Sequence, residues 1–246
     1  MSFILPERVE MFIKKIDEVS SLDEIFDVLF TGLNTIGFEK FSYWMMFAPD
    51  GTKKTMYITN FSNDWRKHYR SNAYASDDLI GNHSKITLTP FIWSDLQKSY
   101  SLTKRQKIIF DEGAEAGLSG GATVPIHGPG MARAAFSVAN SMDEKEFEKF
   151  FLNYRHEVHL MATYAHEKVI ALNLHKPLKG EVVLTPRETE IMVWISKGKS
   201  RWEVAAILGI SEDTVKTHLE NVRRKLKASN TTHAIAIALL HGLILQ

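Results

Sequence analysis

Hydroxyl, basic and amide side chains gather along one stretch near the C-terminus, residues 211–227. Ser211 can accept a hydrogen bond at the start of a helix. Apolar residues recur at helical spacing behind it, at Val215, Leu219, Val222 and Leu226. The outward positions carry groups that can bind base edges or phosphates: Thr214, Lys216, Thr217, Glu220, Asn221, Arg223, Arg224 and Lys227. An ordinary solvated helix face could carry a similar set, so the preceding segment has to decide.

A short helix precedes this stretch and meets it at a tight turn. Ser200 can cap that helix, and Ala205 is small enough to let two helices approach. Gly209 then turns the chain, and Val215 can lock the second helix against the first. This spacing predicts a helix-turn-helix and favours DNA binding over a solvated face.

Within the recognition helix, Lys216 and Glu220 lie one turn apart and are expected to face the bases. Thr217, Arg223 and Arg224 are expected nearer the phosphates. One short recognition helix is a weak reader alone, so we expect a homodimer on a palindromic double-stranded site with half-sites about 10 bp apart.

A second group of candidate residues combines aromatic rings with polar tips. It lies within residues 61–93 and comprises Trp65, Tyr69, Tyr74, Asp78, Phe91 and Trp93. Rings that carry N–H or O–H groups beside a carboxylate suit an apolar pocket with a few orienting polar groups. The same aromatics could simply build a core.

The elements that must position these residues follow from the hydrophobic pattern. Helical patterns cover residues 7–19, 22–36, 63–72, 103–116 and 143–172. Strand patterns cover residues 40–48, 52–60, 122–127 and 131–139, with turns at 49–51 and 128–130. We predict an α+β protein: an N-terminal α-β-α sandwich around an antiparallel sheet, joined to a C-terminal all-α helix-turn-helix domain of four helices.

Composition agrees with two domains. We expect them at residues 1–170 and 184–246, with a linker at 171–183 where Pro177 and Gly180 break the helical pattern. From Leu184 onward there are 9 Lys or Arg against 6 Asp or Glu, whereas the preceding 183 residues hold 21 against 23. The cationic surplus therefore lies in the predicted DNA-binding part. Cysteine is absent and no run approaches a membrane span, so we expect a cytoplasmic protein without membrane contact.

Enzyme and metal chemistry find little support. His156, His159 and His166 share one predicted helix, but the first two are one residue short of the metalloprotease spacing. No serine-histidine or paired-carboxylate arrangement stands out. We expect neither catalysis nor a cofactor.

The C-terminal quarter resembles the four-helix DNA-binding domain of LuxR-type regulators. The resemblance is carried by L-T-P-R-E at 184–188, G-K-S at 198–200, I-S-E-D-T-V-K-T-H at 210–218 and R-K-L at 224–226. It implies a transcription regulator, for which RNA polymerase is a further candidate partner.

The resemblance extends to the N-terminal part. The spacing of Trp65, Tyr69, Tyr74, Asp78, Pro90, Phe91, Trp93 and Gly121 is similar to that of the autoinducer-binding domain of LuxR-type receptors, whose ligands are N-acyl homoserine lactones. By this similarity Trp65 donates to the lactone carbonyl, Asp78 accepts from the ligand amide, and Tyr69 donates to the acyl carbonyl. These roles suit the donors and acceptors of each side chain.

Further ligand contacts are implied in the same way. Trp93 would pack against the lactone ring, and Ser137 would bind an acyl oxygen. Tyr74 belongs to the same set, and Phe61 stands where the family often has tyrosine. The residue after Asp78 is Leu79, where the family usually has proline. Two alternatives stay open: the same fold could sense a different small molecule, or regulate transcription without a ligand.

Overall fold

The computed structural model describes residues 5–47, 54–128, 133–174, 184–240 and 242–244. The chain forms two compact units, one built from α1 to α7 and the strands, the other from α8 to α11. Of the two expected turns, residues 49–51 lie outside the described residues, as do 129 and 130.

Two amphipathic helices open the first domain, α1 (Glu7–Glu18) and α2 (Leu22–Ile36). The Ser21 hydroxyl accepts from the backbone N–H of Glu24, as a helix cap does. The Glu24 carboxylate in turn accepts from the backbone N–H of residue 20, one position before the one that a capping box uses. Gly37 ends α2 with a φ of 109°, a left-handed conformation that glycine adopts without strain.

The centre of this domain is a five-stranded sheet in which every pair is antiparallel. Its strands are β1 (Lys40–Phe47), β2 (Lys54–Thr59), β3 (Phe91–Ile92), β4 (Gly120–His127) and β5 (Arg133–Asn140). Their order is β2-β1-β5-β4-β3. The four longer strands confirm the sequence prediction within two residues, and both hairpins are present as β1–β2 and β4–β5.

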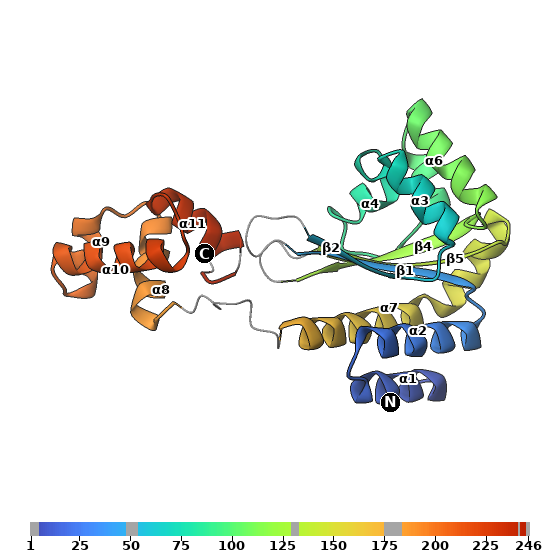
Figure 1. The fold of residues 1–246 in the computed structure, drawn as a ribbon, viewed down its shortest axis with the longest axis horizontal. Coiled ribbons are helices and arrows are strands. Elements are labelled where there is room, and N and C mark those ends of the chain that lie inside the picture. Colours follow the sequence, from blue (N-terminus) through green and yellow to red (C-terminus); the bar gives the residue numbers. More distant parts are fainter. Residues whose placement is uncertain (1–4, 48–53, 129–132, 175–183, 241, 245–246) are drawn as a thin grey trace. The chain divides into compact units, whose positions relative to one another are not determined.

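Helices cover both faces of the sheet, as an α-β-α sandwich requires (Figure 1). On one face lie α1, α2 and α7, and on the other lie α3, α4 and α6. Between β2 and β4 the chain forms α3 (Asn63–Ser71), the 3-10 turn η1 (Tyr74–Ser76), α4 (Leu79–His83), α5 (Trp93–Ser99) and α6 (Lys104–Glu115). The sequence did not predict η1, α4, β3 or α5, each of which has seven residues or fewer.

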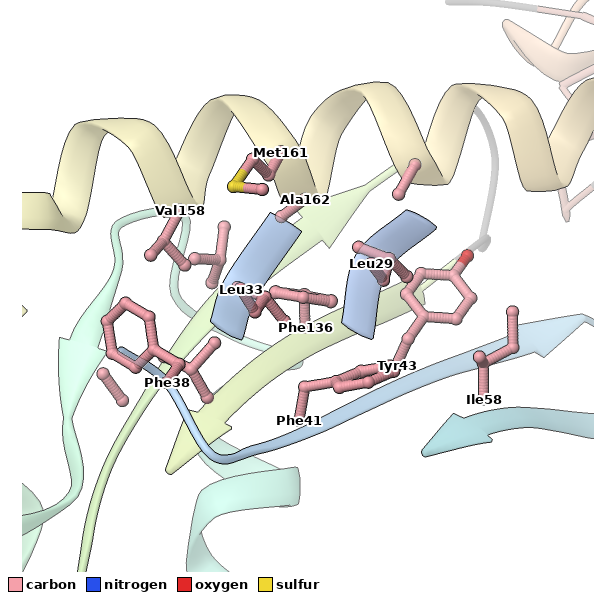
Figure 2. Packing of buried hydrophobic residues seen from close by; sticks show 14 of the residues in the cluster. Leu29, Leu33, Phe38, Phe41, Tyr43, Ile58, Phe136, Val158, Met161 and Ala162 are labelled. Atoms are coloured by element: carbon pink, nitrogen blue, oxygen red, sulfur yellow. The ribbon is translucent and has the colours of Figure 1, made fainter. Parts of the chain in front are cut away.

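The main core lies between the sheet and the α2–α7 side. Alternate strand residues such as Phe41, Tyr43 and Phe136 meet Leu29, Leu33, Val158 and Met161 of the helices, as Figure 2 shows. One polar pair lies within this core: the Tyr43 hydroxyl is 2.7 Å from Nδ1 of His166. Burial lowers the pKa of His166 and raises that of Tyr43. Burial in the core therefore favours the neutral form of His166.

The helix α7 (Glu144–Leu174) is the longest element and packs against α1, α2 and β4. Near its middle, the Glu157 carboxylate accepts from Nε of Arg8 on α1 at 2.6 Å. The helix continues to Leu174, within the range where the sequence places a linker, and residues 175–183 lie outside the described part. Among the described ranges, no helix combines the length and apolar character that crossing a membrane requires.

The second domain consists of four helices, α8 (Pro186–Ser196), α9 (Arg201–Leu208), α10 (Glu212–Lys225) and α11 (Thr231–Leu240). A capping box of Thr185 and Glu188 starts α8, with Pro186 in the first turn, and a second box caps α9 through Ser200. Gly209 ends α9 with a φ of 63°, and Ser211 caps α10 directly after it. This is the helix-turn-helix that the sequence predicts.

Candidate functional sites

A second, smaller apolar cluster lies on the α3–α6 side of the sheet, apart from the main core. We call it the sensor cluster. Its buried members are Trp93, Leu118 and Ala139, and its partly buried members are Phe61, Trp65, Ile80, Phe91 and Phe110. It therefore brings together three of the predicted ligand contacts from different segments: Phe61, Trp65 and Trp93.

Three buried polar groups border this cluster. The indole N–H of Trp93 donates to the Thr123 hydroxyl at 2.8 Å. That hydroxyl is also 2.8 Å from the Ser137 hydroxyl. Thr123 and Ser137 pair across β4 and β5. Gly121 lies under the Trp93 ring and makes room for it, because a Cβ there would meet the ring at 2.3 Å.

Asp78 lies at the start of α4, where its carboxylate accepts hydrogen bonds from a side chain and from the backbone. Oδ1 accepts from the backbone N–H of Ile80 at 2.9 Å, and Oδ2 accepts from the Tyr69 hydroxyl at 2.8 Å. Burial raises the pKa of Asp78, although these hydrogen bonds favour the charged form. Burial also raises the pKa of Tyr69. A carboxylate held in such surroundings would gain from a further N–H donor supplied by a ligand.

Trp65 and Tyr74 have different surroundings. Trp65 meets Tyr69 edge-on with ring centroids 5.9 Å apart, and its indole N–H donates to no group in the described part of the chain. Tyr74 is buried, but its hydroxyl donates to Oε2 of Glu112 on α6 at 2.6 Å. The same carboxylate oxygen lies 2.8 Å from Nε2 of His68. The structure thus leaves the Trp65 donor open to a ligand, and it joins Tyr74 to α6.

A cavity of about 460 Å³ lies elsewhere, between the edge strand β3 and α7. Its walls include Ile92, Phe151, Arg155, His156 and His159. Of the sensor cluster it touches Phe91 alone. His166 turns into the core instead, and no three His, Asp or Glu side chains in the described ranges converge as a metal site needs.

On the second domain, the outward face of α10 carries most of the predicted DNA contacts. Thr214, Lys216, Thr217, Glu220 and Arg224 are exposed. Lys216 and Glu220 line the same hollow of about 260 Å³, together with Arg201, Leu219, Arg223 and Thr231. The two residues expected to contact the bases therefore lie on the same face of α10.

The remaining candidates on α10 differ in how far they are already engaged. Arg223 is half-buried, and its Nη2 donates to the backbone carbonyl of residue 229 at 2.8 Å. Its Nε is buried without a partner. Arg224 donates to the side chain of Asn221, and the Thr217 hydroxyl donates to a carbonyl one turn back. Arg223 thus braces the turn after α10, whereas Arg224 stays on the surface.

Several residues near the sensor cluster were not predicted from the sequence. Thr123, Ile80 and Glu112 all contact predicted ligand residues, at the distances given above. The alternation of strand 122–127 could have placed Thr123 on the same face as Ser137. The strand neighbours of both residues point into the main core, so Thr123 and Ser137 point to the opposite face of the sheet. No local signal marks Glu112, whose partners lie 38 and 44 residues away.

Comparisons with known proteins give a family match for each of the two domains. Residues 21–169 match the family described as autoinducer binding domain, and residues 182–238 match the bacterial regulatory proteins of the luxR family. Among curated relatives, the transcriptional activator protein VanR of Vibrio anguillarum is 32% identical over 239 residues, covering 96% of this chain and 98% of that protein. The activator LuxR of Aliivibrio fischeri is 32% identical over 187 residues, covering 76% and 74%.

Solved structures show the same fold. Escherichia coli SdiA aligns with a TM-score of 0.75 at 21% identity, covering 97% of this chain and 98% of that one. A structure of SdiA in complex with octanoyl-rac-glycerol aligns with a TM-score of 0.73, also at 21% identity, covering 96% and 94%.

A sheet-based domain for autoinducer binding followed by a helix-turn-helix domain defines a ligand-binding transcriptional regulator rather than an enzyme. The match to the autoinducer-binding family spans more than half of the sequence, and the luxR-family match covers most of the remainder. The chain belongs to the LuxR family of transcriptional regulators.

Proposed function

We propose that the first domain binds an N-acyl homoserine lactone at the sensor cluster. The observation that carries this proposal is that an open donor and a partly buried acceptor both lie beside Tyr69: the Trp65 indole N–H, and the Asp78 carboxylate that accepts from the Tyr69 hydroxyl. An acyl homoserine lactone offers a carbonyl for the first and an amide N–H for the second. Trp93 would pack on the lactone ring, and Phe61 supplies apolar contact.

Leu79 fits this proposal although the family usually has proline there. Asp78 is the N-cap of α4, so Leu79 occupies the first helical position. Proline suits that position because no intrahelical partner awaits its N–H, but other residues are also accepted there. Leucine therefore keeps the helix start and forgoes only the restriction that proline would place on the unfolded chain.

Ligand binding should stabilise the purified protein. A ligand that binds only the folded state adds about 4 kcal/mol at a thousandfold excess over its Kd. We expect the thermal midpoint to rise by several degrees for one acyl-chain length in a series of lactones, with fatty acids and homoserine as controls. Octanoyl-glycerol tests for the other ligand class, because a complex of SdiA contains it.

Matched tryptophan variants locate the binding site. Trp65→Phe should lose most of the shift, because it removes the N–H donor and keeps an aromatic ring at this position. Trp202→Phe is the control: Trp202 is 65% exposed on α9, and its replacement should leave the shift intact. An equal shift in wild type and Trp65→Phe would place the ligand elsewhere, and no shift with any lactone would favour another signal or none.

We further propose that the second domain binds a palindromic DNA site as part of a cytoplasmic homodimer, with RNA polymerase as a partner. The exposed recognition face of α10 supports DNA contact. Apolar residues on α7 and α11 make these two helices the candidate dimer surfaces. On α7, Leu152 and Tyr164 are exposed apolar residues, whereas Ala234 and Ala238 of α11 are fully buried in their own core. These exposures favour α7 over α11.

Two variants of α10 should separate base reading from phosphate binding. Lys216→Ala should relax sequence preference, because Lys216 shares the base-facing wall with Glu220. Arg224→Ala should weaken binding to all sequences alike and reduce the salt dependence by about one unit of slope. Gel shifts with the palindrome, a mutated site and random DNA measure both effects. The reverse pattern would refute the assignment.

A further inference from the structure

Three buried hydrogen-bonding groups form a row across the face of the sheet that carries the sensor cluster, which we call the sensor face. Trp93 stands at the start of α5, Thr123 on β4 and Ser137 on β5. Their exposed fractions are 7%, 1% and 7%. Both links of the row are 2.8 Å long. Thr123 is the middle member and the most deeply buried, so its hydroxyl decides how the row is polarised.

The protons of the row can be assigned from the chemistry of its members. An indole N–H is only a donor, so the Thr123 oxygen accepts from Trp93. If Ser137 also donated to Thr123, the threonine proton would have no acceptor at the least exposed of the three positions, which is costly. Thr123 therefore donates to Ser137, and the two bonds reinforce each other in one direction. The Ser137 proton is then left over.

We infer that Thr123 is a positioning residue that turns Ser137 into a hydrogen-bond donor toward a carbonyl oxygen of the ligand. No neighbour in the described part of the chain accepts the Ser137 proton, so a ligand oxygen would complete the row. This inference rests on the proposed function, because it needs an acylated ligand on the sensor face. It assigns a role to Thr123, which need not itself touch the ligand.

A double-mutant cycle tests the inference. Lactone affinity is measured by isothermal titration calorimetry for wild type, Thr123→Val, Ser137→Ala and the double variant. Each single change should weaken binding about tenfold, and the double variant should be no weaker than Ser137→Ala alone, since Thr123 acts through Ser137. Thr123→Ser, which retains the hydroxyl, should restore wild-type affinity.

The NMR resonance of the Trp93 indole gives a second measurement, which does not depend on ligand affinity. In ¹H–¹⁵N spectra, the indole N–H peak assigned by Trp93→Phe should move upfield in Thr123→Val and stay near its wild-type position in Thr123→Ser. If Thr123→Val does not fold, Thr123→Ala replaces it in the cycle.

The possible failures are distinguishable. If wild type binds no lactone, the proposed function fails and this inference falls with it. If wild type binds and Thr123→Val binds equally well, only the inference fails. Additive losses in the double variant would also overturn it, because they would show that Thr123 acts independently of Ser137.

Discussion

Replacing Gly121 with alanine is expected to destabilise the first domain by about 3 kcal/mol, the combined cost of overpacking and of an unpaired buried donor. A Cβ at this position would lie 2.3 Å from Cε3 and 2.4 Å from Cζ3 of Trp93. The ring cannot retreat without breaking its bond to Thr123, and it is only 7% exposed. Amide hydrogen exchange of β4 and β5 in the full chain measures the loss.

Gly113→Ala is the matched control for this variant. Gly113 is a helical residue of α6, and a Cβ there would lie 3.8 Å from the Trp65 ring, an ordinary contact. Alanine should be neutral or stabilise the helix by about 0.5–1 kcal/mol. If Gly121→Ala proved as stable as Gly113→Ala, the Trp93 ring would have more freedom than its contacts indicate.

The larger elements could be predicted because their signals are local. Ser200 and Ser211 marked the starts of α9 and α10, and Gly209 marked the end of α9. Alternating strand residues were enough for the sheet. The short elements η1, α4, β3 and α5 escaped prediction because seven residues or fewer give no clear periodicity.

The candidate sites were harder to predict because their contacts join distant segments. A three-residue turn at 128–130 would pair His127 with Met131, but His127 pairs with Arg133. This two-residue shift sets Thr123 opposite Ser137, and no turn rule anticipates it. Two further contacts likewise depend on tertiary packing: the hydrogen bond from Tyr74 to Glu112, and the one from Arg223 to the backbone carbonyl of residue 229.

The second large effect is expected from Glu188→Ala in the DNA-binding domain. Glu188 is 3% exposed, and its carboxylate accepts from Lys225 at 2.6 Å and from the backbone N–H of Thr185 at 2.7 Å. Its loss removes the buried partner of Lys225 on the recognition helix and half of the α8 capping box. We expect a cost of about 2–3 kcal/mol, below that of a fully buried pair because Lys225 is partly exposed. Hydrogen exchange of α8 and α10 measures it.

At acid pH, wild type should lose the stability that Glu188→Ala lacks. Burial alone would raise the pKa of Glu188, but hydrogen bonds from Lys225 and Thr185 outweigh it and leave the pKa below the ordinary value of 4.5. The stabilisation is therefore complete above pH 4.5 and is lost as the pH falls through the lower, folded-state pKa. Glu190→Ala is the control: Glu190 pairs with Arg187 on the surface, so its loss should cost less than about 0.5 kcal/mol at any pH. Equal effects of the two variants would mean that Lys225 and Thr185 contribute no more than a surface pair. A larger effect of Glu188→Ala would identify the contact between α8 and α10 as a main support of the recognition helix.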